Sequence, residues 1–189
     1  AIAYSWDTEL AQKSAEIAAK EAAVSGVHVT FAPMVDLVRD PRWGRVMEST
    51  GEDPYLNQVF AKAFVTGFQG QDLSNDLQSV AACVKHFAAY GAAEAGRDYN
   101  TVDLSERQLR EMYLPAYKAA LDEGCEMVMT AFNTVDGIPA TGNEKLMRNL
   151  LREEWGFDGV LISDWGAVKE LIPHGVAEDD KEAALKAIK

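Results

Sequence analysis

Four short apolar runs alternate with amphipathic helical segments along this chain of 189 residues. The runs occupy residues 27–32, 80–87, 127–130 and 160–162. Strands that alternate with helices predict an α/β fold with a parallel sheet, whose crossover connections are right-handed. A doubly wound open sheet and part of a TIM-type (β/α)8 barrel both fit this pattern. We expect residues 1–189 to form a single domain.

The helical segments carry recognisable end signals. Asp53-Pro54 places an acid at the cap and a proline in the first turn. Ser105 and Gln108 have the spacing of a capping box, and Pro115 predicts a kink in the same helix. Helices are predicted from Ser5 or Asp7 to Val24, from Asp53 to Phe68, from Ser105 to Gly124, from Asn143 to Trp155, and from Glu178 onward.

Composition narrows the class of protein. Hydrophobic residues make up 48% of the chain, which is enough for one substantial core. The net charge of −12 argues against non-specific binding to nucleic acid and against an anionic membrane surface. No run is long and apolar enough for a membrane span. The chain opens at Ala1 without a visible signal peptide, which leaves its compartment open.

Cysteine and metal chemistry are both disfavoured by the sequence. Cys83 and Cys125 lie in apolar runs, which predicts buried, unpaired thiols rather than nucleophiles. His28, His86 and His174 share no metal-ligand spacing. We therefore expect neither a metal nor another cofactor.

Polar or aromatic side chains lie at or after the carboxyl end of each of the four runs. They are Arg42 and Arg45, Lys85 and His86, Phe132 and Asn133, and Asp164 and Trp165. The carboxyl ends of parallel strands form the active-site face of barrel enzymes, so this repetition favours a barrel. No Gly-x-Gly-x-x-Gly or phosphate-loop motif follows any run, which weakens the nucleotide-binding open sheet.

The run 160–162 is typical of a parallel strand buried on both faces, and Asp164 follows it after one residue, Ser163. Nearby cations would keep its carboxylate ionised as a nucleophile, and Trp165 suits the apolar face of a sugar ring. Arg45 and Lys85 can donate hydrogen bonds to sugar hydroxyls. Two alternatives remain: Ser163-Asp164 can cap the next helix, and Lys85 can form a Schiff base, as in barrel lyases.

Three motifs together resemble glycoside hydrolase family 3, whose members are mostly β-glucosidases and β-xylosidases with a barrel-type N-terminal domain. They are Asp40-Pro41-Arg42-Trp43-Gly44-Arg45, Lys85-His86, and Gly156-Phe157-Asp158-Gly159 followed by Ser163-Asp164-Trp165. The resemblance implies that Asp164 is the nucleophile and that Arg45, Lys85 and His86 bind the terminal sugar.

The family's Met-x-x-Tyr motif falls on Met129 and Phe132, so the tyrosine hydroxyl that would contact the nucleophile is replaced here by a phenyl ring. Residues 85–91 differ from the Lys-His-Phe-Pro-Gly-His-Gly run of the N-acetylglucosaminidase branch, and no Asp-x-His dyad follows them. The resemblance therefore favours the glucosidase-like branch, with Met129, Phe132 and Trp165 among the substrate-binding residues.

The resemblance implies a fragment of a retaining, exo-acting β-glucosidase that cleaves terminal β-linked glucosyl residues through an intermediate on Asp164. Its acid/base glutamate would lie on a second domain, and the chain would form about the middle half of a barrel, in a periplasmic or secreted protein. Alone, the chain is expected to be catalytically silent and to associate with itself or a complementary fragment through open sheet edges. A fragment that only folds or assembles is the alternative.

Overall fold

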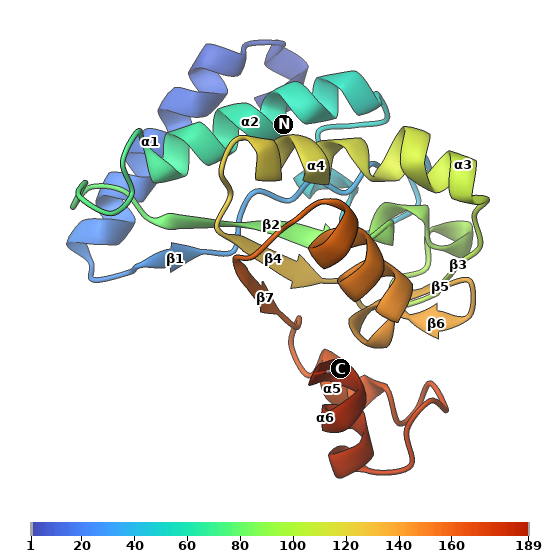
Figure 1. Cartoon of the computed structure of the whole chain (residues 1–189). Coiled ribbons are helices and arrows are strands. Elements are labelled where there is room, and N and C mark those ends of the chain that lie inside the picture. The colour runs from blue at the N-terminus through green and yellow to red at the C-terminus, as the bar shows by residue number, and fades with distance from the viewer. Residues whose placement is uncertain (1, 189) are drawn as a thin grey trace.

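The computed structural model describes residues 2–188 and contains a four-stranded parallel sheet covered by helices (Figure 1). Its strands are β1 (Val29–Thr30), β2 (Ala81–Phe87), β4 (Met127–Thr130) and β7 (Val160–Ile162). They lie in the order β1-β2-β4-β7, and each neighbouring pair is parallel. The predicted α/β fold with parallel strands is confirmed.

Two helices, α2 (Pro54–Gln69) and α4 (Pro115–Asp122), pack over one face of this sheet, and α1 (Thr8–Val24) packs against α2 (Figure 1). Helix α1 turns small residues toward α2, so the two helices approach closely. A Cβ atom on Gly67 of α2 would lie 2.6 Å from Cβ of Ala15 and 2.5 Å from the carbonyl oxygen of Gln12. Only glycine fits at that crossing.

The predicted caps are present, and Pro115 acts somewhat differently from the prediction. Asp53 accepts a hydrogen bond from the N–H of Leu56, and Ser105 accepts one from Gln108. The helix α3 (Glu106–Gln108) continues as the π-helix Leu109–Tyr113 and then restarts at Pro115. Because proline has no N–H to donate, it opens α4 instead of bending one continuous helix.

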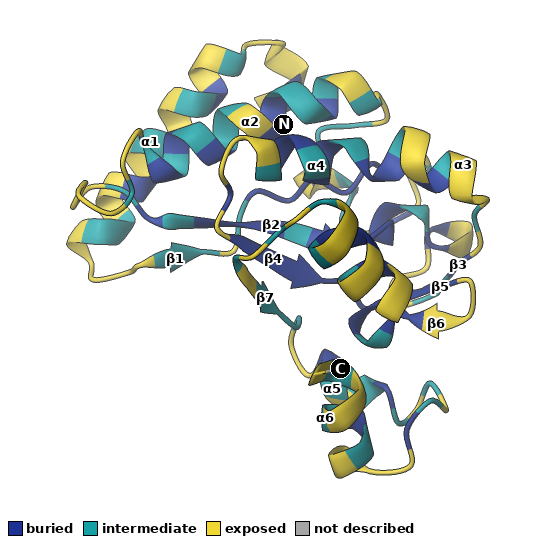
Figure 2. Cartoon of the chain, in the orientation of Figure 1, coloured by how far each residue is buried: buried dark blue, intermediate teal, exposed yellow. Residues whose placement is uncertain are grey.

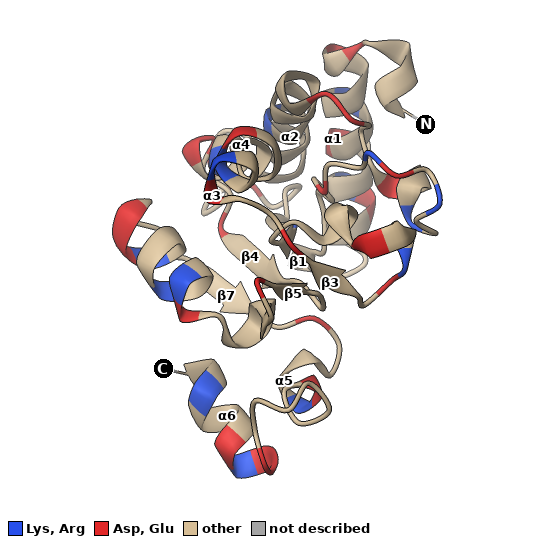
Figure 3. Ribbon diagram, turned by 90° about the vertical axis from the view of Figure 1, so that its right-hand side faces the viewer, with Lys and Arg blue, Asp and Glu red and all other residues tan. Residues whose placement is uncertain are grey.

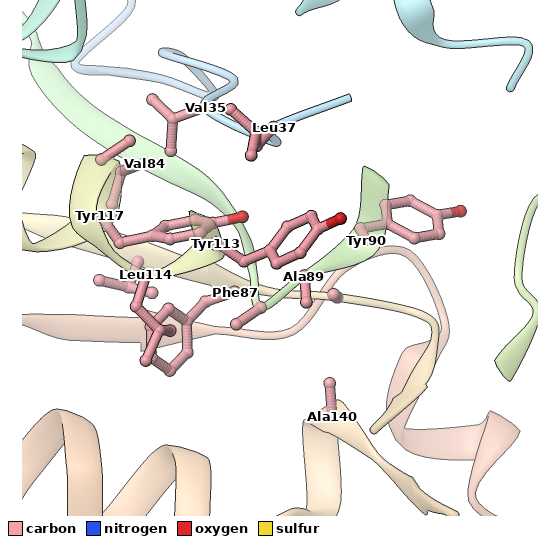
Figure 4. Packing of buried hydrophobic residues seen from close by; sticks show 14 of the residues in the cluster. Val35, Leu37, Val84, Phe87, Ala89, Tyr90, Tyr113, Leu114, Tyr117 and Ala140 are labelled. Carbon is pink, nitrogen blue, oxygen red and sulfur yellow. The ribbon is translucent and has the colours of Figure 1, made fainter. Parts of the chain in front are cut away.

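The main core lies between the sheet and the helices. Val84, Phe87, Leu114 and Tyr117 belong to it and group together in Figure 4. Leu146, Leu150 and Leu151 join it from the π-helix Lys145–Glu154, which stands where an α-helix was predicted. In Figure 2 the ribbons of β2 and β4 are largely buried.

A smaller apolar cluster covers the other face of the sheet. It contains Cys83, Met127 and Met129, with Val29 and Ile162 packed against it. Successive side chains of a strand point to opposite faces, which explains why Val84 and Val128 belong to the main core instead. Both cysteines are buried and unpaired, as predicted. Charged side chains lie mostly on helices and loops, and β4 and β7 carry none (Figure 3).

The prediction that residues 160–162 are buried on both faces is wrong. Val160 is 55% exposed because β7 is at one edge of the sheet and pairs only with β4. At the other edge, the strand predicted over residues 27–32 is regular only at Val29–Thr30. Pairing with β2 continues irregularly beyond it, as the N–H of Val35 donates to the carbonyl oxygen of Lys85.

A second, three-stranded sheet was not predicted from the sequence. It consists of β3 (Thr101–Val102), β5 (Thr134–Val135) and β6 (Ile138–Pro139). Asp136 and Gly137, both with positive φ, form the tight turn between β5 and β6. Since β3 pairs with β5, the long loop after β2 is tied to the loop after β4.

The C-terminal segment packs mainly on itself. Helix α5 (Ala167–Glu170), which the sequence offered only as an alternative, contacts α6 (Asp180–Ile188) through a small cluster around Leu171. In Figure 1 both helices project away from the main sheet. Among the described residues, no helix has the length and apolar character needed to cross a membrane.

Candidate active site

Asp164 and His86 meet at the carboxyl end of the sheet. His86 lies near the end of β2, and Asp164 follows β7 on the far side of β4. Nε2 of His86 lies 3.4 Å from Oδ2 of Asp164. The histidine side chain is 1% exposed and the aspartate side chain 15%, so the carboxylate stands between a buried imidazole and the surface.

Asp164 does not cap the helix that follows it. Its Oδ1 accepts a hydrogen bond of 2.6 Å from the N–H of Trp165, the adjacent residue. Gly166 occupies the cap position of α5 with φ of 69° and makes no side-chain hydrogen bond. The alternative of a structural cap is therefore wrong, and Oδ2 of Asp164 remains directed at His86.

Asp36, which the sequence analysis did not select, holds the other side of the imidazole. Nδ1 of His86 lies 2.7 Å from Oδ2 of Asp36, and the backbone N–H of His86 donates to the same oxygen. The hydroxyl of Tyr117 donates to Oδ1 of Asp36 at 2.7 Å. An acid inside the apolar stretch 33–38 was the signal available in the sequence.

Arg45 is fixed by a second residue that was missed, Glu48. Nε and Nη2 of Arg45 donate to the two carboxylate oxygens of Glu48 at 2.7 and 2.9 Å. This paired bond raises the pKa of Arg45 and lowers the pKa of Glu48. The positive charges of Lys85 and His86 lower the Glu48 pKa further, so all four groups share one electrostatic environment.

Tyr90 lies between the charged groups and an aromatic wall that consists of the rings of Phe132 and Tyr99. Its buried ring lies 5.3 Å from the ring of His86 and 6.0 Å from that of Phe132, and the guanidinium of Arg45 is 5.8 Å from its centroid. Burial raises the pKa of Tyr90 and keeps it a neutral phenol. The ring of Phe132 also packs against that of Tyr99, with centroids 4.4 Å apart and an interplanar angle of 39°, and the Tyr99 ring is half exposed.

The remaining predicted residues are placed differently. Met129 lies in the apolar cluster of the sheet with 4% exposure. The side chain of Trp165 is 91% exposed and is not part of the aromatic wall. Lys85 shares the sheet face of Cys83 by strand alternation, and within residues 2–188 its ammonium group forms no ion pair with an acid.

Other chemistry has little support at this site. Burial raises the pKa of Cys83 to about 12 and that of Cys125 to about 11, which keeps both thiols protonated. Within residues 2–188, no three or more His, Cys, Asp or Glu side chains are arranged to hold a metal ion. Asp98, an acid on the loop after β2, is engaged with another residue, because its carboxylate accepts a hydrogen bond from the indole N–H of Trp43 at 2.9 Å.

A parallel α/β sheet with charged groups gathered at the carboxyl ends of its strands defines a barrel-type enzyme domain. Residues 1–188 match the family described as "Glycosyl hydrolase family 3 N terminal domain", and the chain belongs to this family.

Relatives of known name cover the whole chain. It is 47% identical to the periplasmic β-glucosidase of Salmonella typhimurium over 188 residues, which are 100% of this chain and 24% of that protein. It is 40% identical to a β-xylosidase of Formosa agariphila, covering 100% of this chain and 27% of that one.

A solved structure is similar at the level of both sequence and fold. It is a mutant β-glucosidase from Listeria innocua in complex with laminaribiose, with a TM-score of 0.97 and 61% identity. The match covers 98% of this chain and 26% of that protein. The chain thus spans about a quarter of the length of the relatives it matches.

Proposed function

We propose that this chain is part of a retaining, exo-acting β-glucosidase and that it supplies the nucleophile, Asp164. The observation that carries the proposal is the placement of this carboxylate. It is partly exposed at the carboxyl end of β7, is held at Oδ1 by the N–H of Trp165, and faces His86 through Oδ2. A carboxylate that is held by a donor on one oxygen and faces an imidazole with the other is preorganised to attack the anomeric carbon of a bound sugar.

In the proposed reaction, an oxygen of Asp164 forms an ester bond to the anomeric carbon of the terminal glucosyl residue. The glycosidic C–O bond breaks, and its electron pair stays on the departing oxygen, which takes a proton from an acid. Water then attacks the anomeric carbon, gives its proton to the same group, and releases Asp164 as a carboxylate. In retaining enzymes the two carboxyl groups are about 5–5.5 Å apart.

We propose that the acid/base group comes from outside residues 1–189. Asp98 is bound to Trp43, and Glu94 is exposed on the loop after β2. Among the described residues, the carboxylate of Asp164 contacts His86 and the N–H of Trp165 instead. The complete enzyme, meaning a protein that joins these residues to the further length found in the relatives, would supply the missing acid.

We propose that Arg45, Lys85 and His86 surround the hydroxyls of the terminal sugar. Arg45 is held rigidly by Glu48, and Lys85 has no competing acid among the described residues, so both can donate to a neutral polyol. Tyr99, which is half exposed, offers an apolar surface on which a sugar ring can stack, and the buried Phe132 supports its ring from behind. Met129 packs in the apolar cluster on the other face of the sheet, and the exposed Trp165 would contact the next sugar.

Glucose is the sugar we propose for this site, because the β-glucosidases from Listeria innocua and Salmonella typhimurium are 61% and 47% identical to the chain, against 40% for the β-xylosidase. The Listeria protein was crystallised with laminaribiose, a β-linked disaccharide of glucose. The name of the Salmonella protein includes "periplasmic", and we propose a periplasmic or secreted location here.

The proposal is tested by trapping the intermediate in the complete enzyme with a 2-deoxy-2-fluoro-β-glucoside that carries an activated leaving group. We expect one label per active site, and peptide mapping should place it on Asp164. Asp158→Asn, an exposed acid at the other end of the same strand, is the matched control and should label normally. A label on any other carboxylate would overturn the assignment.

One competing reaction is tested with the same preparation. A lyase that uses Lys85 would be trapped by borohydride in the presence of a carbonyl substrate, because the Schiff base is reduced to a stable amine. We expect no such adduct on Lys85.

A further inference from the structure

A pair of buried side chains, Asp36 and His86, lies directly behind the proposed nucleophile. Their side chains are 0% and 1% exposed. Asp36 belongs to the loop after β1, His86 to β2, and Asp164 to the loop after β7. Three segments that are distant in the sequence therefore form a continuous row, carboxylate to imidazole to carboxylate, across the end of the sheet.

Asp36 is surrounded by hydrogen-bond donors. Oδ2 receives the N–H of His86 at 3.2 Å and lies 2.7 Å from Nδ1 of the same residue, while Oδ1 lies 2.7 Å from the Tyr117 hydroxyl. Burial raises the pKa of Tyr117, so this hydroxyl remains a donor. A fully buried carboxylate is costly unless charged or polar donors compensate it, and these three contacts do so.

These contacts leave His86 one orientation. Since an ionised Asp36 can only accept at Oδ2, Nδ1 of the imidazole carries a hydrogen. The Tyr117 hydroxyl also lies 2.5 Å from the carbonyl oxygen of His86, so its one hydrogen is shared between the backbone and the acid. The ring cannot turn about its axis without breaking the bond to Asp36. Nε2 is consequently directed at Oδ2 of Asp164.

The opposite oxygen of Asp164 is held by the N–H of Trp165. When His86 is in the imidazolium form, with a second hydrogen on Nε2, the carboxylate of Asp164 has a donor on each oxygen. The separation of 3.4 Å is long for a hydrogen bond, and contacts of this kind tighten when substrate occupies a site.

We propose that Asp36, supported by Tyr117, is a positioning residue that holds His86 as a hydrogen-bond donor to Asp164 and so fixes the carboxylate for attack. This inference rests on the proposed function of Asp164. It adds a task for His86 that sugar binding alone does not include. Outer partners of this kind orient groups that touch the substrate without touching it themselves.

The test measures how fast the 2-fluoro glucoside inactivates variants of the complete enzyme. Its rate constant reports attack by the nucleophile, and its inhibition constant reports binding. For Asp36→Asn we expect the rate constant to fall roughly 10–100-fold, as for other outer-shell partners, with the inhibition constant changed less than about threefold. Asp122→Asn, an exposed acid paired with Lys118 on α4, is the charge-matched control and should behave as the unchanged enzyme.

Tyr117→Phe keeps the test decisive if Asp36→Asn does not fold. Its ring remains packed on Phe87, whose centroid is 5.2 Å away, and only the hydroxyl is lost. We expect an inactivation rate constant lowered about 3–10-fold, the effect of one hydrogen bond. Rates are normalised to folded protein by near-ultraviolet circular dichroism, so a purely structural role would lower thermal stability and leave the rate constant unchanged.

The possible outcomes separate the two proposals. If Asp164 is labelled in the unchanged enzyme and the folded variants at Asp36 and Tyr117 react at its rate, the positioning role is overturned and the nucleophile stands. If Asp164 is not labelled in the unchanged enzyme, the proposed function itself fails. A slower rate constant with an unchanged inhibition constant supports both.

Discussion

Nδ1 of His86 lies 2.7 Å from Oδ2 of Asp36, although fifty residues separate them in the sequence. Both side chains are inaccessible to solvent, so the contact is formed only when β1 and β2 pair and their following loops pack together. Because this contact fixes Nδ1, it directs Nε2, on the opposite edge of the imidazole, at Asp164. The geometry of the candidate site therefore depends on a buried contact as much as on its exposed residues.

Asp164→Asn in the complete enzyme is expected to lower kcat roughly 10⁴-fold or more, because the amide cannot form the ester intermediate. Binding of glucose should change less than about threefold, since the nucleophile is needed in the transition state far more than in the ground state. Steady-state kinetics on a nitrophenyl β-glucoside and calorimetric titration with glucose measure the two effects. Turnover near that of the unchanged enzyme would exclude Asp164 as nucleophile.

Arg45→Ala and Lys85→Ala should each lower kcat/KM, with a loss of about 1.5–3 kcal/mol of transition-state binding for one charged hydrogen bond. Arg42→Ala is the matched control from the same loop, because its guanidinium pairs with Asp40 at the surface. We expect no more than about a twofold effect there, as is usual for exposed pairs. Equal kinetics for all three variants would place Arg45 and Lys85 outside the sugar site.

Gly67→Ala should destabilise the chain by about 1–3 kcal/mol, because a new Cβ would lie 2.6 Å from Ala15 at the crossing of α1 and α2. This outcome opposes the helix propensity of alanine, which favours the substitution by about 1 kcal/mol. Gly44→Ala, where no atom lies within 4 Å of the added Cβ, is the control for denaturation by urea. A Gly67 variant as stable as the control would mean that the helices are more widely spaced.

The two thiols should resist alkylation in the native protein at pH 8 and react on unfolding. Burial raises the pKa of Cys125 to about 11 and of Cys83 to about 12 from an ordinary value of 9.0. The folded state therefore keeps protons that the unfolded state loses above pH 9, and the free energy of unfolding should fall between about pH 9 and pH 12. Mass spectrometry after timed alkylation measures the first effect; rapid labelling without denaturant would contradict it.

The isolated chain should be catalytically silent on a nitrophenyl β-glucoside, because the proposed acid/base group is absent and general acid help contributes about 10²–10⁴-fold. We also expect it to sediment as more than one 20.7 kDa chain, since β1 and β7 present unpaired backbone groups at the two edges of the sheet. Clear activity would direct attention to Asp98 and Glu94. A monomer with cooperative unfolding would show that the edges are covered in another way.

Local rules were enough to predict much of the fold and the proposed nucleophile. The cap at Asp53 depends on the residues next to it, and the position of Asp164 after a strand depends on the apolar run before it. The alternation of strands and helices limited the fold to parallel α/β, because few topologies satisfy such a pattern. The Lys85-His86 pair could be selected from the sequence in the same way, since it lies near the end of its own strand.

Tertiary structure alone decided which side chains meet. Asp36 was overlooked because an acid in an apolar run has no local partner, and its role appears only when His86 and Tyr117 close around it. The edge position that exposes Val160 depends on the order of strands rather than on the composition of β7. Contacts between segments far apart in the chain have no periodicity in the sequence, so packing and buried hydrogen bonds select them after the local elements have formed.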